Sequence, residues 1–418
     1  MKKIRIKSSL FFLLVLRSIV STGAQAAPPL DSLEACFHEA QQQLNTLLTK
    51  ANEIDSLFPR TIDNKGEVVF TNQYEWTSGF FPGSLWYAYE GTRDESLRKE
   101  AIKWTEKLQG LKDFKEHHDL GFMVYCSYGN AYRLTKDEKY KDILVQAAHS
   151  LSTRFCEKTG VIKSWNAFGS WRGKEKYTFP VIIDNMMNLE LLFFASKVTG
   201  DTRYRDMAIR HAENTLKNQI RKDYSCFHVV CYDPKNGQVL TQETAQGYAD
   251  NSTWARGQAW AIYGFTMTYR ETKYPRFLEA ARKMADYYID HPNLPADKIT
   301  FWDFNAYQRG YTPSKRSNAN HVRTNYRDAS AAAVVASALF ELATFTGQHE
   351  KKYRTAAIQI LESLSNPAYF ASHGTNGGFL LKHSVGSIPH GVEIDVPLVY
   401  ADYYYLEALN RYIQSPTP

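Results

Sequence analysis

His118-Asp119-Leu-Gly-Phe-Met and Ile183-Asp184-Asn-Met-Met are two similar stretches that each open an apolar segment. The two segments also end alike, in Arg133-Leu-Thr-Lys-Asp-Glu-Lys-Tyr140 and Lys197-Val-Thr-Gly-Asp-Thr-Arg-Tyr204. Each stretch therefore predicts the same unit of helix, turn and second helix. The two aspartates lie 65 residues apart at the same place in this unit. A repeated scaffold would direct both carboxylates to one region, which makes them the first candidates for acid/base chemistry.

Apolar residues recur at helical spacing along most of the chain, and strand-like alternation is confined to short pieces such as 227–232. The fold class is therefore predicted to be all-α, with two kinds of helix in alternation. Apolar helices rich in alanine and aromatic residues are predicted at 79–91, 119–134, 184–199, 255–271, 328–346 and 395–412. Amphipathic, charged helices are predicted at 30–54, 95–110, 137–156, 201–219, 274–290 and 349–364.

Six such helical hairpins predict an (α/α)6 toroid, with the apolar helices in an inner ring and the amphipathic helices in an outer ring. An open solenoid is the alternative, and its terminal repeats would need polar outer faces. The last predicted helix contains the run Val396-Pro-Leu-Val-Tyr-Ala-Asp-Tyr-Tyr-Tyr-Leu406, which is typical of an interior helix. The toroid is therefore the preferred interpretation.

The first 26 residues have the pattern of a secretory signal. A basic segment at 2–7 precedes an apolar run at 10–20, and Ala24-Gln25-Ala26 closes the run with small residues. No other stretch approaches the roughly 20 uncharged apolar residues of a membrane span. We therefore expect residues 1–26 to be removed on export to the periplasm and residues 27–418 to form a single domain.

Net charge and cysteine content limit the functional classes that the chain can belong to. The formal net charge of +6 falls to +1 without residues 1–26, which carry five basic residues and no acidic one. A nearly neutral mature chain argues against a nucleic-acid or membrane-surface role. The cysteines are odd in number, and their spacing does not favour a zinc site. Export permits disulfides, and Cys226 and Cys231 are candidates for one that closes a loop around His228.

The surroundings of the two aspartates distinguish them from ordinary helix caps. Asp119 follows His117 and His118, and Asp184 follows the apolar run Pro180-Val-Ile-Ile183, which would desolvate its carboxylate and raise its pKa. The alternative is that both aspartates are helix N-caps. Asp328 and Asp395 open predicted helices without such neighbours, so we expect them to be caps or structural partners.

A second constellation opens the fourth apolar helix, Trp254-Ala-Arg256-Gly-Gln-Ala-Trp260. Arg256 offers a planar fork for a carboxylate or sulfate, and the two indoles offer faces for a sugar ring. The alternative is that Arg256 pairs with a loop acid such as Asp250. Long loops at 157–183, 221–254 and 291–327 all lead into inner helices and would share one rim of the ring, as in a binding cleft.

Four motifs together carry a family resemblance: Trp76-Thr-Ser-Gly-Phe-Phe-Pro-Gly, His118-Asp119-Leu-Gly-Phe, Ile183-Asp184-Asn-Met-Met-Asn-Leu and Asp250-Asn-Ser-Thr-Trp-Ala-Arg-Gly-Gln-Ala-Trp260. In this order and spacing the chain resembles the unsaturated glucuronyl hydrolases of glycoside hydrolase family 88, from about residue 55 to 412. The resemblance implies an (α/α)6 barrel without a metal or cofactor. It also implies hydration of the 4,5-unsaturated uronic acid that a lyase leaves on glycosaminoglycan oligosaccharides.

The resemblance assigns roles by motif. Asp184 would be the general acid/base and Asp119 its essential partner. Trp76, Trp254 and Trp260 would stack on sugar, while polar groups of the uronate would be bound by Arg256, Gln246, His118 and His228. One of Trp165 and Trp171 would line the same pocket, and Trp171 is the preferred candidate. Ser384, Ser387 and His390 are further subsite candidates.

One loop of this chain departs from the family pattern, and two alternative functions remain open. Members that act on sulfated chondroitin-type substrates use a loop with serine and lysine before the last helix, whereas the loop at 383–393 keeps two serines and has no lysine after them. A hydrolase of unsaturated galacturonyl-rhamnose from pectin would share the barrel and both aspartates. An exported glycan-binding protein without catalysis is the rival of another class.

Overall fold

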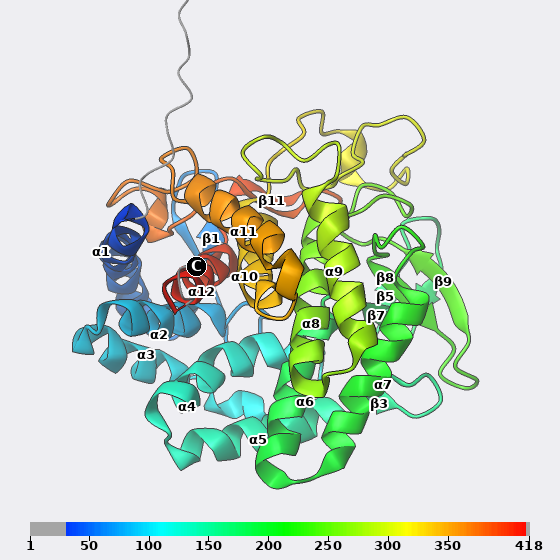
Figure 1. The fold of residues 1–418 in the computed structure, drawn as a ribbon, viewed down its shortest axis with the longest axis horizontal. Helices are drawn as coiled ribbons and strands as arrows, with labels where there is room; N and C mark the ends of the chain where they lie inside the picture. The colour runs from blue at the N-terminus through cyan, green and yellow to red at the C-terminus, as the bar shows by residue number, and fades with distance from the viewer. Residues whose placement is uncertain (1–30, 415–418) are drawn as a thin grey trace, which may run out of the picture.

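Helices that are apolar on every side must be surrounded by other helices, and helices with one apolar face cover them. The computed structural model describes residues 31–414, and there this division produces two rings (Figure 1). The inner ring consists of α2 (Phe80–Thr92), the π-helical segment η2 (Gly121–Gly129) with α4 (Asn130–Thr135), α6 (Asn185–Thr199), α8 (Ala255–Thr272), α10 (Ala329–Ala343) and α12 (Val399–Gln414). The outer ring consists of α1 (Asp31–Ile54), α3 (Glu95–Glu106), α5 (Glu138–Ser152), α7 (Thr202–Asn218), α9 (Pro275–Ile289) and α11 (Glu350–Leu364).

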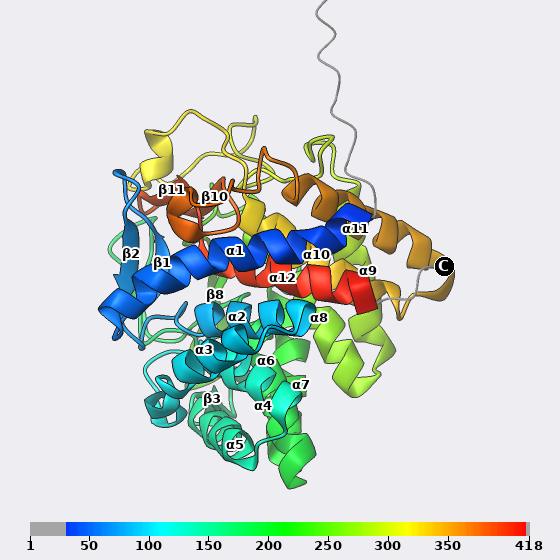
Figure 2. The ribbon, with the colours of Figure 1, turned by 90° about the vertical axis from the view of Figure 1, so that its left-hand side faces the viewer.

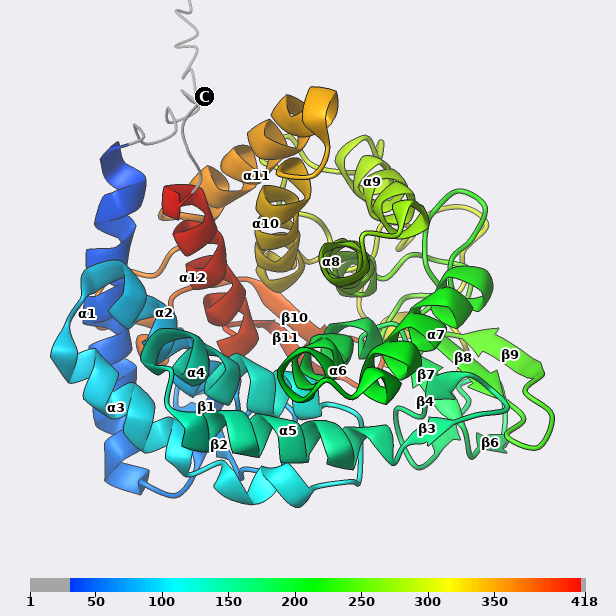
Figure 3. The ribbon, with the colours of Figure 1, turned by 60° about the horizontal axis from the view of Figure 1, so that its bottom comes forward.

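The inner ring is closed. Each inner helix contacts the next one along the chain, and α12 returns to contact α2 (Figure 3). The outer helices lie outside these pairs in the same order. The prediction of an (α/α)6 toroid is confirmed, and the open solenoid is wrong because a solenoid has no contact between its first and last repeats.

The burial pattern follows the sequence. Every residue of α10 is buried except Glu341, whereas α9 buries one face at helical spacing. Aromatic rings fill the centre of the inner ring: Phe122 lies 5.5 Å from Phe80 and 5.1 Å from Trp260, centroid to centroid, and Trp260 lies 5.3 Å from Tyr404. This aromatic layer separates the two ends of the barrel.

Three turns between inner and outer helices share one construction. Each outer helix starts at an aspartate whose side chain accepts a hydrogen bond from a backbone N–H in the first turn, namely Asp94, Asp137 and Asp201. One residue earlier, the inner helix ends in the left-handed conformation, and Gly200 adopts it with φ 77°. These caps satisfy backbone groups that the helix ends leave free, and they fix the hairpin geometry.

Short antiparallel strands occupy the loops that lead into the inner helices. They are β1 (Phe58–Ile62) with β2 (Val68–Thr71), β3 (Phe155–Cys156) with β4 (Val161–Ile162), β5 (Phe168–Gly169) with β6 (Lys176–Tyr177), β7 (Pro180–Ile182) with β8 (Val229–Tyr232) and β9 (Val239–Glu243), and β10 (Ser384–Ser387) with β11 (Val392–Val396). In Figure 2 the loop before α10, drawn in yellow, lies beside β10 and β11, and Asn318 N–H donates to the Pro389 carbonyl between them.

The predicted helices agree with the structure to within about four residues at each end. The predicted start of the last helix at 395 is wrong: the chain remains extended through Val396 in β11, and α12 begins only at Val399. Pro397 explains this, because the residue before a proline is kept out of the helical region. Asp395 instead accepts a contact from His383 Nδ1 at 2.7 Å, as a structural partner.

Cys226 and Cys231 are free thiols, as are the other described cysteines. Cys231 is held in β8 against Pro180 of β7, whereas Cys226 forms a separate bridge with Ile220, so the extended chain between them keeps the two sulfurs apart. The signal predicted at 1–26 lies outside the described residues. Within the described part, no helix has the length and apolar content needed to cross a membrane.

Candidate active site

A pocket of about 410 Å³ lies at the end of the barrel where the inner helices begin. It is lined by Asp119 just before η2, Asp184 just before α6 and Arg256 in the first turn of α8. Loop residues complete the lining: Trp76, Trp165, Ala167, Phe168, Gly169, Trp171, Ile182, Ala245, Gln246 and His390. Helix N-termini carry a positive partial charge, so this end of the ring favours an anionic ligand.

Asp184 is a buried carboxylate that the protein leaves unsatisfied. It stands at the N-cap position of α6, but its side chain makes no capping hydrogen bond. Its Oδ2 has no hydrogen-bond partner among the described residues. Burial, and next the negative charge of Asp119, raise the pKa of Asp184 to about 7, while Arg256 acts in the opposite direction. Asp184 can therefore hold a proton at neutral pH and release it on demand, as a general acid requires.

His228 is oriented toward this carboxylate. The backbone N–H groups of Ala245 and Gln246 both donate to His228 Nδ1, each at 3.1 Å. Nδ1 is therefore the acceptor, and the proton of the neutral ring must be on Nε2. Burial, followed by the charge of Arg256, lowers the pKa of His228 well below its ordinary value, so the ring is neutral. Nε2–H lies 3.7 Å from Asp184 Oδ2 and is poised to donate to it.

Asp119, unlike Asp184, is paired with neighbouring side chains, and its pKa is lowered. Its Oδ2 lies 3.0 Å from His117 Nδ1, and its Oδ1 lies 3.1 Å from His118 Nε2. Burial by itself would raise the pKa of Asp119, but the two histidines outweigh it and bring the pKa below the usual value. The same contact raises the pKa of His117 against the effect of burial. Asp119 is thus an ionised carboxylate beside a protonatable Asp184, and this division is what acid/base chemistry needs.

Arg256 is tied into the protein more firmly than the sequence suggested. Its guanidinium donates to Asp328 Oδ2 at 3.0 Å and to the backbone carbonyls of Val385 and Gly386, the latter at 2.7 Å. The alternative pairing with Asp250 is wrong, because Asp250 accepts from Arg172 instead. Asp328 also caps α10, as expected. Arg256 thereby fixes β10 beside the pocket while its positive charge remains next to Asp184.

The loops place further groups at the pocket. Trp171 Nε1–H donates to the Ala245 carbonyl at 3.0 Å, and its ring meets His390 edge to face at 4.9 Å. Ser387 holds His390 through a 2.6 Å contact to Nδ1. Gln246 reaches the Gly386 carbonyl at 3.4 Å. The structure thus brings both Trp165 and Trp171 to the pocket, where the sequence pattern offered a choice of one.

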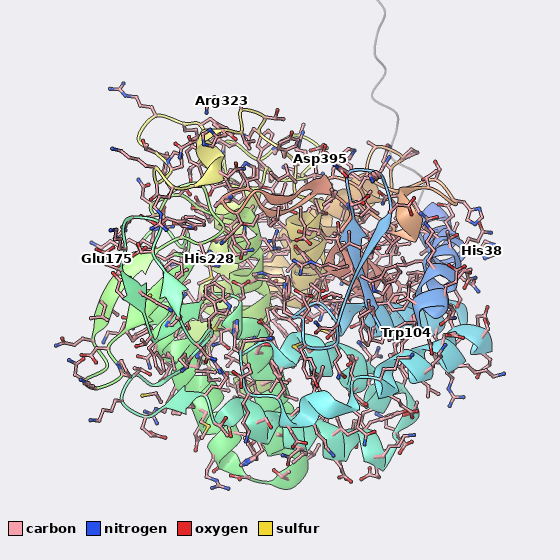
Figure 4. All side chains as sticks on the ribbon, turned by 180° about the vertical axis from the view of Figure 1, so that it is seen from behind. His38, Trp104, Glu175, His228, Arg323 and Asp395 are labelled. Atoms are coloured by element: carbon pink, nitrogen blue, oxygen red, sulfur yellow. The ribbon has the colours of Figure 1, made fainter. Side chains whose placement is uncertain are left out.

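Besides Trp165, the structure brings seven of the predicted site residues to the pocket lining: Trp76, Asp119, Trp171, Asp184, Gln246, Arg256 and His390. The other six are buried behind it: His118, His228, Trp254, Trp260, Ser384 and Ser387. In Figure 4 His228 lies well inside the outline of the molecule, whereas Glu175 and Arg323 lie at its edge. These six side chains have little exposed surface, and their direct contact with a ligand stays a prediction.

Packing explains why these residues are covered. Trp260 is fully buried in the aromatic layer with Phe122 and Tyr404. Trp254 lies under His228, with 4.4 Å between ring centroids, and the guanidinium of Arg256 lies 4.6 Å from its ring. Protein groups lie against both indoles, and the expectation that these indoles stack on sugar stays a prediction.

The same holds for the smaller residues. His118 is 0% exposed and acts on Asp119 from behind, and burial lowers its own pKa to about 4. Ser384 is fully buried, and Ser387 acts through His390. His117 was noted as a neighbour of Asp119 without a role in the site, and Phe168 was not predicted to line the pocket. The only signal for His117 was its position two residues before the aspartate.

Within residues 31–414, no group of histidine, cysteine, aspartate and glutamate is arranged to hold a metal ion. The acid/base pair Asp184 and Asp119 is the chemical machinery that the described site offers. It can transfer a proton to a bound anion and take one back from water.

Comparison with known proteins identifies relatives over most of the chain. The family model described as Glycosyl Hydrolase Family 88 matches residues 53–413. An unsaturated glucuronyl hydrolase of Formosa agariphila is 46% identical over 356 residues, which cover 85% of this chain and 84% of the relative. An unsaturated chondroitin disaccharide hydrolase of Streptococcus pyogenes serotype M1 is 35% identical, with 86% of each chain covered. The crystal structure of an unsaturated glucuronyl hydrolase specific for heparin superimposes with a TM-score of 0.84 and 45% identity, covering 92% of this chain and 97% of that one.

Proposed function

The chain belongs to glycoside hydrolase family 88, and from this premise we propose that it removes the 4,5-unsaturated uronic acid from the non-reducing end of lyase-generated glycosaminoglycan oligosaccharides. The observation that carries the proposal is the pair of carboxylates in one pocket, Asp184 with a pKa raised to about 7 and Asp119 with a pKa below its usual value. An exported glycan-binding protein would have no need of a buried, unsatisfied acid, which costs stability.

The chemistry is hydration of an enol ether. Protonated Asp184 gives its proton to C4 of the unsaturated ring, and positive charge develops on C5 and the ring oxygen. Water adds at C5, and its proton passes to the Asp184 carboxylate, which restores the acid. The resulting hemiketal opens and releases the next sugar. The anomeric carbon is never attacked, so the carboxylate spacing that separates inverting from retaining glycosidases does not apply.

The remaining groups support this reaction. The positive charge of Arg256 and the N-termini of the inner helices favour the uronate's carboxylate. Trp76 is the aromatic side chain at the mouth of α2 that lines the pocket, and it offers a face to the sugar. Asp119 stays ionised beside His117 and opposes loss of the proton from Asp184, because two adjacent negative charges repel.

The test uses purified protein without residues 1–26 and unsaturated disaccharides prepared with lyases from hyaluronan, chondroitin, heparin and pectin. Hydration destroys the conjugated double bond, so its ultraviolet absorbance should fall with a glycosaminoglycan disaccharide. Loss with the pectin product alone would favour the galacturonyl-rhamnose rival. Saturable binding without any loss of absorbance would establish the non-catalytic rival instead.

We also propose export, in Gram-negative cells to the periplasm. The basic segment at 2–7, the apolar run at 10–20 and Ala24-Gln-Ala26 support it. An N-terminal sequence near Ala27 in protein recovered from a periplasmic fraction would agree with this. Recovery of uncleaved chain from the cytoplasm would contradict it.

A further inference from the structure

A second cavity of about 520 Å³ adjoins the catalytic pocket. We call it the rim cavity, and it is lined by Gly169, Ser170, Gly173, Lys174, Glu175, Lys176 and Arg316. The two cavities share Gly169, and Trp171 of the catalytic pocket lies within the same loop. A ligand that extends beyond the catalytic pocket on the Trp171 side therefore meets the rim cavity next.

The backbone around the rim cavity is held in place. β5 and β6 pair Gly169 with Lys176, and Ser170 N–H donates to the Glu175 carbonyl at 3.1 Å. The Ser170 hydroxyl donates to the buried carboxylate of Glu243 at 2.6 Å. The loop that carries the two lysines is thus part of a rigid scaffold, which is a requirement for a binding subsite.

The rim cavity carries excess positive charge. Three cations and one carboxylate line it, and no Asp or Glu oxygen of the described chain lies within 4.0 Å of the charged nitrogens of Lys174, Lys176 or Arg316. By contrast, the neighbouring Arg172 is paired with Asp250. Arg316 is fixed by donating to the backbone carbonyls of Ser170 and Gly173, which are neutral and leave its charge uncompensated.

The loop on the other side of the catalytic pocket cannot supply these charges. The segment from His383 to Glu393 contains no lysine or arginine. The guanidinium of Arg256 is already occupied by Asp328 and two carbonyls. Among the residues that line the two cavities, the lysines and arginines left for the part of a ligand beyond the reacting ring are those of the rim cavity.

We propose that the rim cavity is a subsite for an anionic group on the part of the oligosaccharide beyond the unsaturated uronate. This inference rests on the proposed function. The reacting ring lies at Asp184, so the rest of the oligosaccharide passes Trp171 and His390 and brings its next negative charge to Lys174, Lys176 and Arg316. That charge is a sulfate ester on the second sugar or the carboxylate of the next uronate, which share the same chemistry of recognition.

Two substrate comparisons distinguish these sources. The first compares two unsaturated disaccharides that differ by one sulfate ester on the second sugar. The second compares an unsulfated disaccharide with an unsulfated tetrasaccharide from hyaluronan, which adds one uronate carboxylate. In each comparison the measured quantity is the ratio of kcat/KM for the more anionic substrate to kcat/KM for the less anionic one, at low and at high salt.

The double variant Lys174→Gln/Lys176→Gln should lower one of these ratios by about threefold to tenfold, the range for losing two exposed charge contacts. The effect should appear in KM and fade at high salt. Glu175→Gln should raise the same ratio, because it removes the carboxylate of the rim cavity. Lys315→Gln is the matched control, since this exposed lysine neighbours Arg316 and lines neither cavity.

A fall in the first ratio assigns the subsite to sulfate, and a fall in the second assigns it to the carboxylate. If neither ratio moves while the wild type hydrates its substrates, the subsite is overturned and the proposed function stands. If Lys315→Gln changes the ratios as much as the double variant, general surface charge replaces the subsite. If the wild type hydrates none of the substrates, the proposed function fails and this inference fails with it.

Discussion

The two ends of the barrel hold cavities of similar size and opposite character. The catalytic pocket, about 410 Å³, lies where the inner helices begin, and a cavity of about 390 Å³ lies where they end. In the cavity where the inner helices end, the acids are paired: Glu90 with Arg133 at 2.6 Å, and Glu190 with Arg270. Glu407 accepts from the hydroxyl of Tyr263 at 3.0 Å. In the catalytic pocket Asp184 Oδ2 has no hydrogen-bond partner among the described residues, and His228 Nε2 lies 3.7 Å from it.

This difference shows how one scaffold separates stability from chemistry. At the end of the barrel where the inner helices end, which we call the closing end, arginines near helix C-termini form ion pairs with carboxylates, an arrangement that helix dipoles favour. At the end where the inner helices begin, burial and the charge of Asp119 outweigh the opposing effect of Arg256 on Asp184, so the pKa of Asp184 rises and folding bears the cost. Substitutions at the two ends should therefore have opposite consequences.

The largest expected effect is loss of turnover on Asp184→Asn, which removes the transferable proton and keeps the shape. We expect kcat to fall by about 10²–10⁴-fold, the usual contribution of a general acid. Substrate binding, followed by calorimetry, should persist. Turnover within tenfold of wild type would remove Asp184 from the role of acid.

The pH dependence should follow from the same group. Because the pKa of Asp184 is raised to about 7, the acid is protonated below pH 7 and loses its proton above it. We expect kcat/KM to decline by about tenfold per pH unit well above pH 7. Asp119 stays ionised throughout this range, since its pKa is below the usual value. A profile flat from pH 6 to 9 would contradict the assignment.

At the closing end, Glu407→Leu should lower stability and spare the chemistry. The change leaves the buried hydroxyls of Tyr87, Tyr263 and Ser337 without their acceptor. We expect the free energy of unfolding to fall by about 3 kcal/mol or more, because each buried group left unsatisfied costs roughly 1–3 kcal/mol. Denaturant unfolding measures this, with kcat/KM of the folded protein as the control. A large loss of kcat/KM in folded protein would show that the two ends are coupled.

Asp184→Asn should do the reverse and stabilise the protein at high pH. The unfolded chain has an ordinary aspartate with a pKa of 3.8, and folding raises it to about 7. The folded state therefore holds the extra proton between these values, and its stability falls as pH rises through this window. The variant lacks this loss, so at pH 8 we expect it to be more stable than wild type by up to roughly 4 kcal/mol, the equivalent of about three pKa units. Equal stability at pH 8 would argue against burial as the cause.

The smallest expected effect concerns His228, which touches Asp184 without lining the pocket. Its Nε2–H favours the ionised form of Asp184, so His228→Phe should raise the pKa of Asp184 further. We expect the alkaline limb of the pH profile to move up by less than about one unit. A purely structural role would lower kcat/KM at every pH and leave the limb in place.

Periodicity made the fold predictable. Apolar residues on all sides of one set of helices and on one side of the other require two rings, and the Asp-capped turns recur visibly in the sequence. The strands were predicted less well, because they are two to five residues long and depend on partners far along the chain, as in the pairing of β7 with β8. Pro397 was the local signal that the last helix starts late.

The candidate site was only half predictable. Asp119 and Asp184 could be chosen because each carries local signals, a histidine pair and an apolar run. Trp254, Trp260, His118 and His228 share their motifs but lie behind the pocket surface. A motif shows that residues belong together, and it does not show which of them ends up exposed.

The sequence by itself determined the helical rings, the pair of aspartates and the membership of a family, because these depend on spacing along the chain. The tertiary structure alone decided that Asp184 is unsatisfied while Asp119 is paired, that Arg256 holds β10, and that Lys174, Lys176 and Arg316 meet beside the pocket. The physical reason is that burial and electrostatics act through space, so they depend on neighbours that the order of residues does not reveal.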